Sequence, residues 1–161
     1  MKRHDGYSIV ELLVVLGILA LIAGFVLPNI GDSVKKYEFR NSYRTLIEQI
    51  STVKSEAITR NTTSRLSLQQ VAGVYTLTAY VTPTPVANCN GSNPWTQIST
   101  MTLDVPREFQ ITGSGVGDIC FYRDSSSTGG QYVYDDGAAN IGSATITIAI
   151  ATGYLDVDAT Y

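Results

Sequence analysis

Glu11 is the side chain whose chemistry fits least well with its surroundings. It lies in the segment GYSIVELLVVLGILALIAGFVLP, residues 6 to 28, which carries no other charged side chain and is mostly apolar. A carboxylate at membrane depth is costly, and such a residue usually faces a protein partner or a cavity. The position therefore indicates a carboxylate that meets an ionic or polar group within an assembly.

An amine for this carboxylate could come from one helical turn back. Tyr7 lies four residues before Glu11 and follows Gly6. Residues four apart are neighbours on a helix surface. Cleavage between Gly6 and Tyr7 would therefore place a new α-amine near the carboxylate of the same subunit or of a neighbouring one. Pairing between subunits would favour helix packing in one register.

The other reactive side chains do not form a catalytic or metal-binding set. The sequence holds one histidine, His4, and two cysteines, Cys89 and Cys120, which gives neither zinc-ligand spacing nor a Cys–His pair. The segment GSGVGD at 113–118 lacks the lysine and the helix start of a phosphate loop. The segment YDDG at 134–137 is more typical of a hairpin turn than of a calcium loop. We expect no enzyme activity, no cofactor and no metal site.

The apolar run has the length of a membrane span. Tyr7 to Leu27 is about 21 residues, which as a helix extends about 31 Å, close to the hydrocarbon thickness of a bilayer. Lys2 and Arg3 precede the run, so the positive-inside rule predicts a cytoplasmic N-terminus. A secretory signal peptide would need a small-residue cleavage site after a shorter apolar core. Here the run continues into Pro28, which is expected to kink the helix.

Basic leader, glycine, glutamate and apolar span, in this order, resemble the N-terminus of type IV prepilins and type II secretion pseudopilins. In that family, prepilin peptidase removes a short basic leader ending in Gly, and the new N-terminal residue is N-methylated. The resemblance implies cleavage between Gly6 and Tyr7, methylation of Tyr7, and an assembly role for Glu11. Pro28 matches the proline that often bends the pilin helix. Tyr7 departs from the Phe that the family usually has.

A second resemblance concerns the segment VKSEAITRNTTSRLSL, residues 53 to 68. It is similar to the end of the long helix and the first strand in the GspH/FimT-like branch of minor pilins and minor pseudopilins. The resemblance implies a structural minor subunit assembled into a type IV pilus. The alternatives are a minor pseudopilin of a type II secretion system, or a pilus-tip module that binds a surface or DNA. FimT-like DNA receptors carry a basic Gly-Arg-x-Arg motif near the C-terminus, whereas this chain ends in the acidic segment TGYLDVDATY, so nucleic acid is not an expected partner.

The resemblance also implies partners and a location. The partners are other pilin or pseudopilin subunits through the N-terminal helix, prepilin peptidase, the inner membrane and the inner-membrane assembly platform. The chain would cross the bacterial inner membrane once, with a periplasmic C-terminal domain, before it joins a filament. We expect four segments: a removed leader at 1–6, a membrane and filament-core helix at 7–28, its amphipathic continuation at 29–61, and a β-rich domain at 62–161.

Residues 29–61 have helical periodicity. Their apolar stripe consists of Phe39, Tyr43, Leu46, Ile47, Ile50, Val53, Ala57 and Ile58, which predicts that one helix face packs on a domain. Lys54 falls inside the stripe, and we expect its stem to pack while its amine snorkels to water. The basic cluster Lys35, Lys36, Arg40 and Arg44 is interpreted as a solvated face, with contacts to acidic neighbours or lipid head groups as the alternative.

After Asn61 the pattern changes to the alternation of strands. Residues 65–81 predict a hairpin that turns at Ala72–Gly73, with Leu66, Leu68, Tyr75, Leu77 and Ala79 in alternating positions. Six further strand candidates are 97–105, 108–112, 118–122, 131–135, 144–150 and 154–158. One long helix followed by strands predicts an α+β architecture with an antiparallel sheet packed on the helix, which is the pilin fold that the resemblance implies. Tyr132, Tyr134 and Tyr154 are expected to pack in the sheet.

The two cysteines are candidates for a disulfide. Cys89 lies in a predicted surface loop at 83–95 and Cys120 in a predicted strand. In an oxidising periplasm they could pair and close a long loop, which would contribute about 3–4 kcal/mol. Two unpaired thiols are the alternative. Major pilins often place their disulfide nearer the C-terminus, so this position favours a minor subunit.

Overall fold

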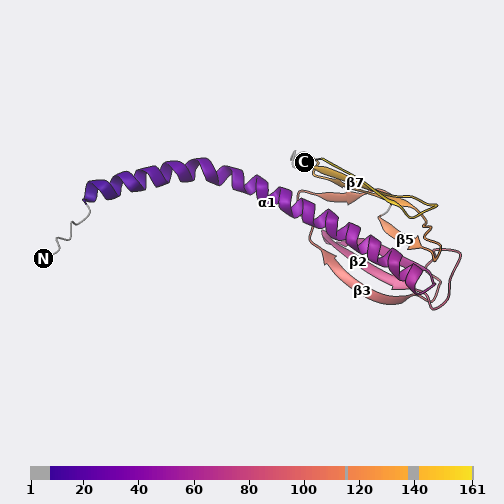
Figure 1. The fold of residues 1–161 in the computed structure, drawn as a ribbon. Helices are drawn as coiled ribbons and strands as arrows, with labels where there is room; N and C mark the ends of the chain where they lie inside the picture. Colours follow the sequence, from indigo (N-terminus) through magenta and orange to yellow (C-terminus); the bar gives the residue numbers. More distant parts are fainter. Residues whose placement is uncertain (1–7, 115, 138–141, 161) are drawn as a thin grey trace. The chain divides into compact units, whose positions relative to one another are not determined.

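The chain contains one long helix and eight strands in its described residues, 8–114, 116–137 and 142–160 of a computed structural model (Figure 1). The side chains of residues 23, 25–30 and 32 are also outside the description. Two compact units are present, Met1–Lys35 and Lys36–Tyr161. Helix α1, Ile9–Thr59, contributes to both units.

Helix α1 ends in a hydrogen-bonded cap that its sequence supplies. Asn61 adopts a φ of 51°, and its N–H donates to the carbonyl of Ile58 at 3.1 Å. The N–H of Thr62 donates to the carbonyl of Ala57 at 2.9 Å. This is the Schellman arrangement, in which a left-handed residue satisfies carbonyls that the last turn leaves without partners. The helix therefore stops at Thr59, two residues before the expected boundary.

Within Lys36–Tyr161, the helix packs through most of the predicted stripe. Six of its members are at most 5% exposed: Phe39, Tyr43, Leu46, Ile50, Val53 and Ala57. Ile47 is half-buried against the same core. Ile58 is 44% exposed, so its assignment to the buried face was wrong. It follows Ala57 by a rotation of about 100°, in the last turn before the chain leaves the helix.

The first two strands form the predicted hairpin. Strand β1, Ser64–Val71, pairs antiparallel with β2, Val74–Val81. Ala72 and Gly73 have φ values of 51° and 82°, and two consecutive positive φ angles are typical of a two-residue type I′ turn. The five apolar side chains predicted at alternating positions are all at most 3% exposed, which confirms the register: Leu66, Leu68, Tyr75, Leu77 and Ala79.

The eight strands form two sheets, where one was expected. The six strands that follow the hairpin are β3 (Thr96–Leu103), β4 (Gln110–Thr112), β5 (Gly117–Phe121), β6 (Gly130–Asp135), β7 (Ser143–Ile148) and β8 (Leu155–Thr160). One four-stranded sheet has the order β3-β2-β1-β5 and the other β4-β6-β7-β8. All strand pairs are antiparallel. The expected α+β architecture is thus confirmed, with its strands divided between two sheets.

The last of the three crossings between the sheets is the connection from β5 to β6. Phe121 and Ser127 form an isolated antiparallel bridge. Gly129 then takes a φ of 73° and Gly130 a φ of 159°. A Cβ on Gly129 would lie 2.5 Å from Cγ1 of Ile150, so a larger residue could not make this close turn without displacing its neighbour.

Helix and sheets share one hydrophobic core within Lys36–Tyr161. The second half of α1 lies along the strands (Figure 1), and Phe39 stacks on Phe109 with ring centroids 4.6 Å apart. Tyr132 and Tyr134 are fully buried as expected, and burial raises the pKa of both phenols. Tyr154 is 65% exposed, so its expected packing was wrong; it lies between the turn at 150–152 and β8.

Candidate assembly segment

Helix α1 begins at an N-cap formed by Ser8. The Ser8 Oγ accepts a hydrogen bond from the N–H of Val10 at 3.3 Å. The Ser8 carbonyl accepts from the N–H groups of Glu11 and Leu12 at 3.0 and 3.2 Å. The spacing Ser-x-x-Glu over residues 8–11 is the capping-box pattern. Sequence analysis did not identify this cap, although the pattern alone could have located the helix start.

This start places Glu11 in the first turn of α1. A carboxylate in a first turn interacts favourably with the positive end of the helix dipole, which gives Glu11 one local role besides any pairing between subunits. Gly6 and Tyr7 lie outside the described residues. Cleavage between them, methylation of Tyr7 and the pairing of its amine with Glu11 stay predictions.

The predicted kink at Pro28 also stays a prediction. Pro28 lies within the continuous residue range of α1, and its side chain is outside the description.

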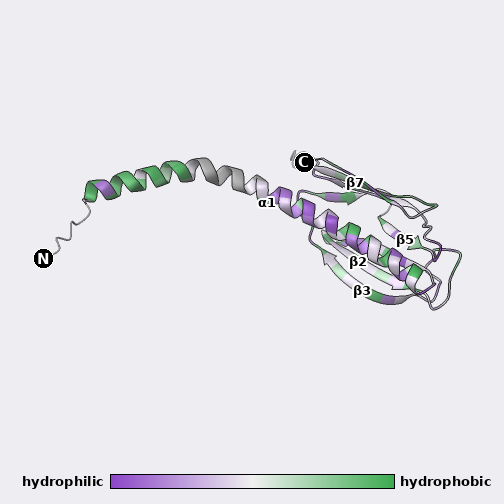
Figure 2. Ribbon diagram, viewed as in Figure 1, coloured by the Kyte–Doolittle hydropathy of each residue, from purple (hydrophilic) through white to green (hydrophobic). Residues whose placement is uncertain are grey.

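In the first half of α1, up to Lys35, the described side chains from Ile9 to Ile22 are apolar apart from Glu11 and are exposed on all faces of the helix. Its large side chains are between 51% and 80% exposed: Ile9, Val10, Leu12, Leu13, Val14, Val15, Leu16, Ile18, Leu19, Leu21 and Ile22. In Figure 2 this part of the ribbon is mostly green, the colour of hydrophobic residues, with one hydrophilic interruption near the start of the helix. A helix that is hydrophobic all round is normally surrounded by other protein or by lipid.

The membrane span expected over Tyr7 to Leu27 stays a prediction. Within the described part of the chain, no helix meets the combined length and hydropathy expected of a segment that crosses a membrane. An exposed apolar surface of this extent nevertheless marks a site of contact with other protein or with lipid.

Three glycines recur every seven residues along α1. At Gly17, Gly24 and Gly31, an added Cβ would meet no atom within 4 Å, so no contact described within the chain requires a glycine there. A glycine costs about 1 kcal/mol relative to alanine inside a helix. With Ala20 between the first two, these positions form a small-residue face that lets another helix approach closely.

In the globular unit, the Cys89–Cys120 disulfide anchors the loop at 83–95 to β5, with a Cα–Cα distance of 5.8 Å. Cys120 is fully buried. The indole Nε1 of Trp95 donates to the carbonyl of Asn90 at 2.7 Å. The loop is therefore held both by a covalent bond and by its own side chains.

Arg65 supports the same loop from the outer face of β1. Its guanidinium carbon lies 4.4 Å from the ring centre of Tyr80 and 4.7 Å from that of Trp95. Its Nη1 donates to Oδ2 of Asp118 at 3.2 Å. The Arg65 side chain is only 13% exposed. Stacking of a guanidinium on aromatic rings gains strength on desolvation, so this cluster fixes the loop over the sheet.

Lys54, the exception in the apolar stripe, binds the turn between β7 and β8. Its ammonium donates to the carbonyls of Thr152 and Gly153 at 3.0 and 3.1 Å. Gly153 is buried, and a Cβ there would lie 2.5 Å from the carbonyl oxygen of Ser125. The amine was expected to reach water; instead it joins the helix to the C-terminal sheet.

The globular unit offers few groups for ligand chemistry. A hollow of 390 Å³ is lined in part by Pro85, Tyr122 and Asp124. Burial, and then the charge of Asp124, raises the pKa of Tyr122, whereas hydrogen bonds from Ser126 lower the pKa of Asp124. Among the described side chains, no group of three or more histidines, cysteines and carboxylates is placed to hold a metal ion.

Comparison with known proteins connects the N-terminal segment and the fold. Residues 1–27 match the family described as the prokaryotic N-terminal methylation motif. A crystal structure of the type IV minor pilin FimU of Pseudomonas aeruginosa strain PAO1 matches with a TM-score of 0.59, covering 76% of this chain and 89% of that chain at 12% identity. A second crystal form of FimU gives a TM-score of 0.54 at 12% identity, covering 74% and 91%. No curated protein sequence matches this chain.

Residues 1–27 thus carry the N-terminal methylation motif, and the chain shares the fold of a type IV minor pilin. The particular protein whose fold it resembles, FimU, is a minor pilin.

Proposed function

We propose that this chain is a structural minor pilin subunit, processed by prepilin peptidase and assembled into a type IV pilus. The observation that carries the proposal is the exposed apolar half of α1, which directly follows an N-terminal methylation motif and precedes a pilin-fold domain. The type IV minor pilin identity of FimU favours a pilus over a secretion pseudopilus.

Processing would create the charge that Glu11 requires. Removal of residues 1–6 leaves Tyr7 as the N-terminus, and its α-amine carries a positive charge at neutral pH. Within the inner membrane, this amine lies near the Glu11 carboxylate of the same chain, since the two residues are one helical turn apart. In a filament, Glu11 pairs with the amine of a neighbouring subunit instead.

Apolar contact alone does not determine the register in which helices of neighbouring subunits pack when a subunit moves from the membrane into the filament. Lipid tails are as apolar as leucine, so transfer of the helix from membrane to filament gains little from hydrophobic burial. The charge pair and the close approach at Gly17, Gly24 and Gly31 supply the positional preference. Both features occur in the half of α1 whose side chains find no cover within the described chain.

The globular unit stays folded throughout this transfer. Its core is formed by its own helix half and both sheets, and the Cys89–Cys120 disulfide ties the β2–β3 loop to β5. It therefore remains periplasmic while the subunit waits in the membrane, and it forms the outer layer of the filament. Besides other pilin subunits, the chain would contact the inner-membrane platform that assembles the filament.

Intact mass of the mature protein from its native host tests processing. The proposal predicts loss of residues 1–6, addition of one methyl group at Tyr7, and a gain of two hydrogens on reduction of the disulfide. Recovery of the same species in sheared surface pili distinguishes a pilin from a pseudopilin. A mature chain that retains residues 1–6 would contradict the proposal.

A further inference from the structure

Three of the outer strands in the two sheets carry features that discourage pairing with another chain. Strand β8 exposes Asp156 and Asp158, and β4 has only three residues. The backbone of β5 is partly occupied, because the N–H of Thr128 donates to the carbonyl of Cys120 at 3.0 Å. Charge, shortness and cover are the usual protections of a sheet edge.

Strand β3 lacks all three protections. It has eight residues, TQISTMTL, with no charge and no proline. In the part of the chain that the structure describes, it pairs with β2 alone and forms one end of its sheet. A register shift beside Ala79 and Tyr80 leaves a regular stretch at Ser99–Leu103. This stretch presents unpaired backbone groups along its outer side, which is a template for another strand.

Within the chain, the regular stretch pairs with a segment of β2 that has the same alternation of threonine and apolar residues. Thr100–Thr102 reads Thr-Met-Thr and lies antiparallel to Thr76–Thr78 of β2, which reads Thr-Leu-Thr. Met101 is opposite Leu77, and one facing pair of threonine hydroxyls lies 2.8 Å apart. The threonines occupy the outer face, since they alternate with the buried side chains of β2.

We propose that β3 pairs antiparallel with β3 of a second copy of this chain, centred on Met101. In this register Thr100 lies opposite the partner's Thr102, and Met101 lies opposite the partner's Met101. The second copy thus presents to β3 the same threonine, apolar, threonine pattern that β2 presents on its other side. Cross-strand threonine pairs and apolar pairs both stabilise sheets.

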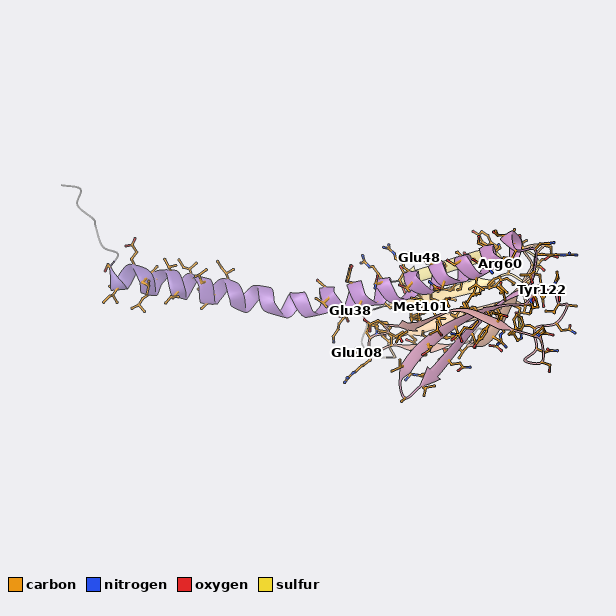
Figure 3. All side chains as sticks on the ribbon, turned by 90° about the horizontal axis from the view of Figure 1, so that it is seen from below. Glu38, Glu48, Arg60, Met101, Glu108 and Tyr122 are labelled. Atoms are coloured by element: carbon orange, nitrogen blue, oxygen red, sulfur yellow. A yellow bond between two sulfur atoms is a disulfide. The ribbon has the colours of Figure 1, made fainter. Side chains whose placement is uncertain are left out.

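Charge distinguishes this edge from the alternative edge for self-pairing. Antiparallel pairing of β8 with its own copy would bring Asp156 and Asp158 of both copies together, and like charges across strands are destabilising. Strand β3 brings no charges together. Met101, labelled in Figure 3, is half-buried at the margin of the core, so the second copy would complete its burial.

The proposed β3–β3 interface involves only the globular unit. It is separate from the helix contacts of the proposed filament, and the proposed pilin function holds with or without it.

Disulfide trapping in the full-length chain in detergent tests the pairing. Met101→Cys places one thiol opposite its own copy, and mild oxidation after the native disulfide has formed should give a covalent dimer. Asp158→Cys is the matched control, because it lies exposed on the other long edge strand. Equal dimer yields from the two variants would mean association through α1 alone and would overturn the proposal.

Added charge gives the second test in the Met101→Cys background. Thr100→Lys with Thr102→Lys places each lysine opposite a lysine of the partner, and two such repulsions should lower the dimer yield about tenfold. Gln69→Lys with Gln70→Lys adds the same charge at exposed positions of β1 and should leave the yield unchanged. An undiminished yield in the β3 lysine variant overturns the proposal.

A measurement on the unmodified chain covers the case in which Met101→Cys does not fold. Amide hydrogen exchange within Ser99–Leu103 should slow as protein concentration rises, because pairing protects the outer backbone groups. Exchange that is independent of concentration would contradict the pairing.

Discussion

The two halves of α1 share one helical backbone, yet their apolar side chains have opposite surroundings. From Ile9 to Ile22 the large apolar side chains are 51–80% exposed, whereas the apolar stripe from Phe39 to Ala57 contains side chains that are at most 5% exposed. The second half is stabilised by the chain's own sheets. The first half must be covered from outside the described chain. One helix therefore contributes a buried stripe to the globular core and an exposed apolar segment that we propose as the assembly element.

Glycines repeat this contrast. In the globular unit, a Cβ on Gly113 would lie 2.3 Å from the carbonyl oxygen of Gln131, so the fold requires a glycine there. At Gly24 in the first half of α1, a Cβ would meet nothing within 4 Å. No contact in the described chain requires the glycine at this position, where it costs helix stability; the proposed assembly would supply such a contact.

The largest expected effect separates the two helix halves directly. Phe39→Ala removes a fully buried ring that stacks on Phe109, and it should lower the free energy of unfolding by about 3–5 kcal/mol. Leu19→Ala, at a 55% exposed position, should change it by less than about 0.5 kcal/mol. Urea denaturation of the full chain in detergent, followed by the fluorescence of Trp95, measures both. Equal losses would refute the division of the helix.

The disulfide comes next in size. Cys89→Ser with Cys120→Ser should lower the free energy of unfolding by about 3 kcal/mol, since the closed loop is long. Trp95 is the sole tryptophan and stacks on Arg65 within this loop, so its emission reports loop opening without an added probe. A reductant should lower the free energy of unfolding of the natural chain by the same amount and should have no effect on the variant. An unchanged emission after complete reduction would mean that the side chains alone hold the loop.

Lys54 should have a smaller effect, again confined to the globular half. Lys54→Met keeps the apolar stem but removes two charged hydrogen bonds to the β7–β8 turn, at a cost of about 2 kcal/mol. Hydrogen exchange should show the loss first at the amide of Gly153. Glu48→Gln is the control, because Glu48 is exposed and projects from the helix away from the strands (Figure 3). Equal hydrogen-exchange protection of the β7–β8 turn in Lys54→Met and in the natural chain would contradict this role of Lys54.

The smallest effect concerns pH. The pKa of Asp124 is lowered by hydrogen bonds from the Ser126 side chain and backbone, so these bonds stabilise the fold when pH is above the unfolded pKa. That contribution is lost as pH falls through the lower folded pKa. Ser126→Ala should raise the pKa of Asp124, which a carboxyl NMR titration would detect. An unshifted titration would assign the lowering to another cause.

Local patterns predicted much of the fold from sequence. Alternation identified the buried face of the first hairpin, and Ala72–Gly73 identified its turn, because both depend on residues that are close in sequence. The helical stripe was correct from Phe39 to Ala57 for the same reason. The motif around Gly6, Tyr7 and Glu11 is equally local, and its match to a known family rests on its residue order.

Contacts between distant residues could not be predicted in this way. Lys54 meets a carbonyl 98 positions later, so its period on the helix gave no indication of its partner. The crossing from β5 to β6 brings Gly129 against Ile150, 21 residues later. Tyr154 has the alternation of a strand residue but lies between the turn at 150–152 and β8, because β8 starts one residue later than the pattern indicated. Tertiary packing decided each of these positions.

The amount of this chain in sheared surface pili, compared between the natural protein and Glu11→Gln, tests the central claim most directly. Glutamine keeps the size of the side chain and removes its charge. The account predicts that Glu11→Gln is processed, remains in the inner membrane with an intact globular domain, and falls to background in the pili, while Glu48→Gln in the second helix half assembles normally. Equal amounts of Glu11→Gln and natural protein in the pili would contradict an assembly role for the first half of α1.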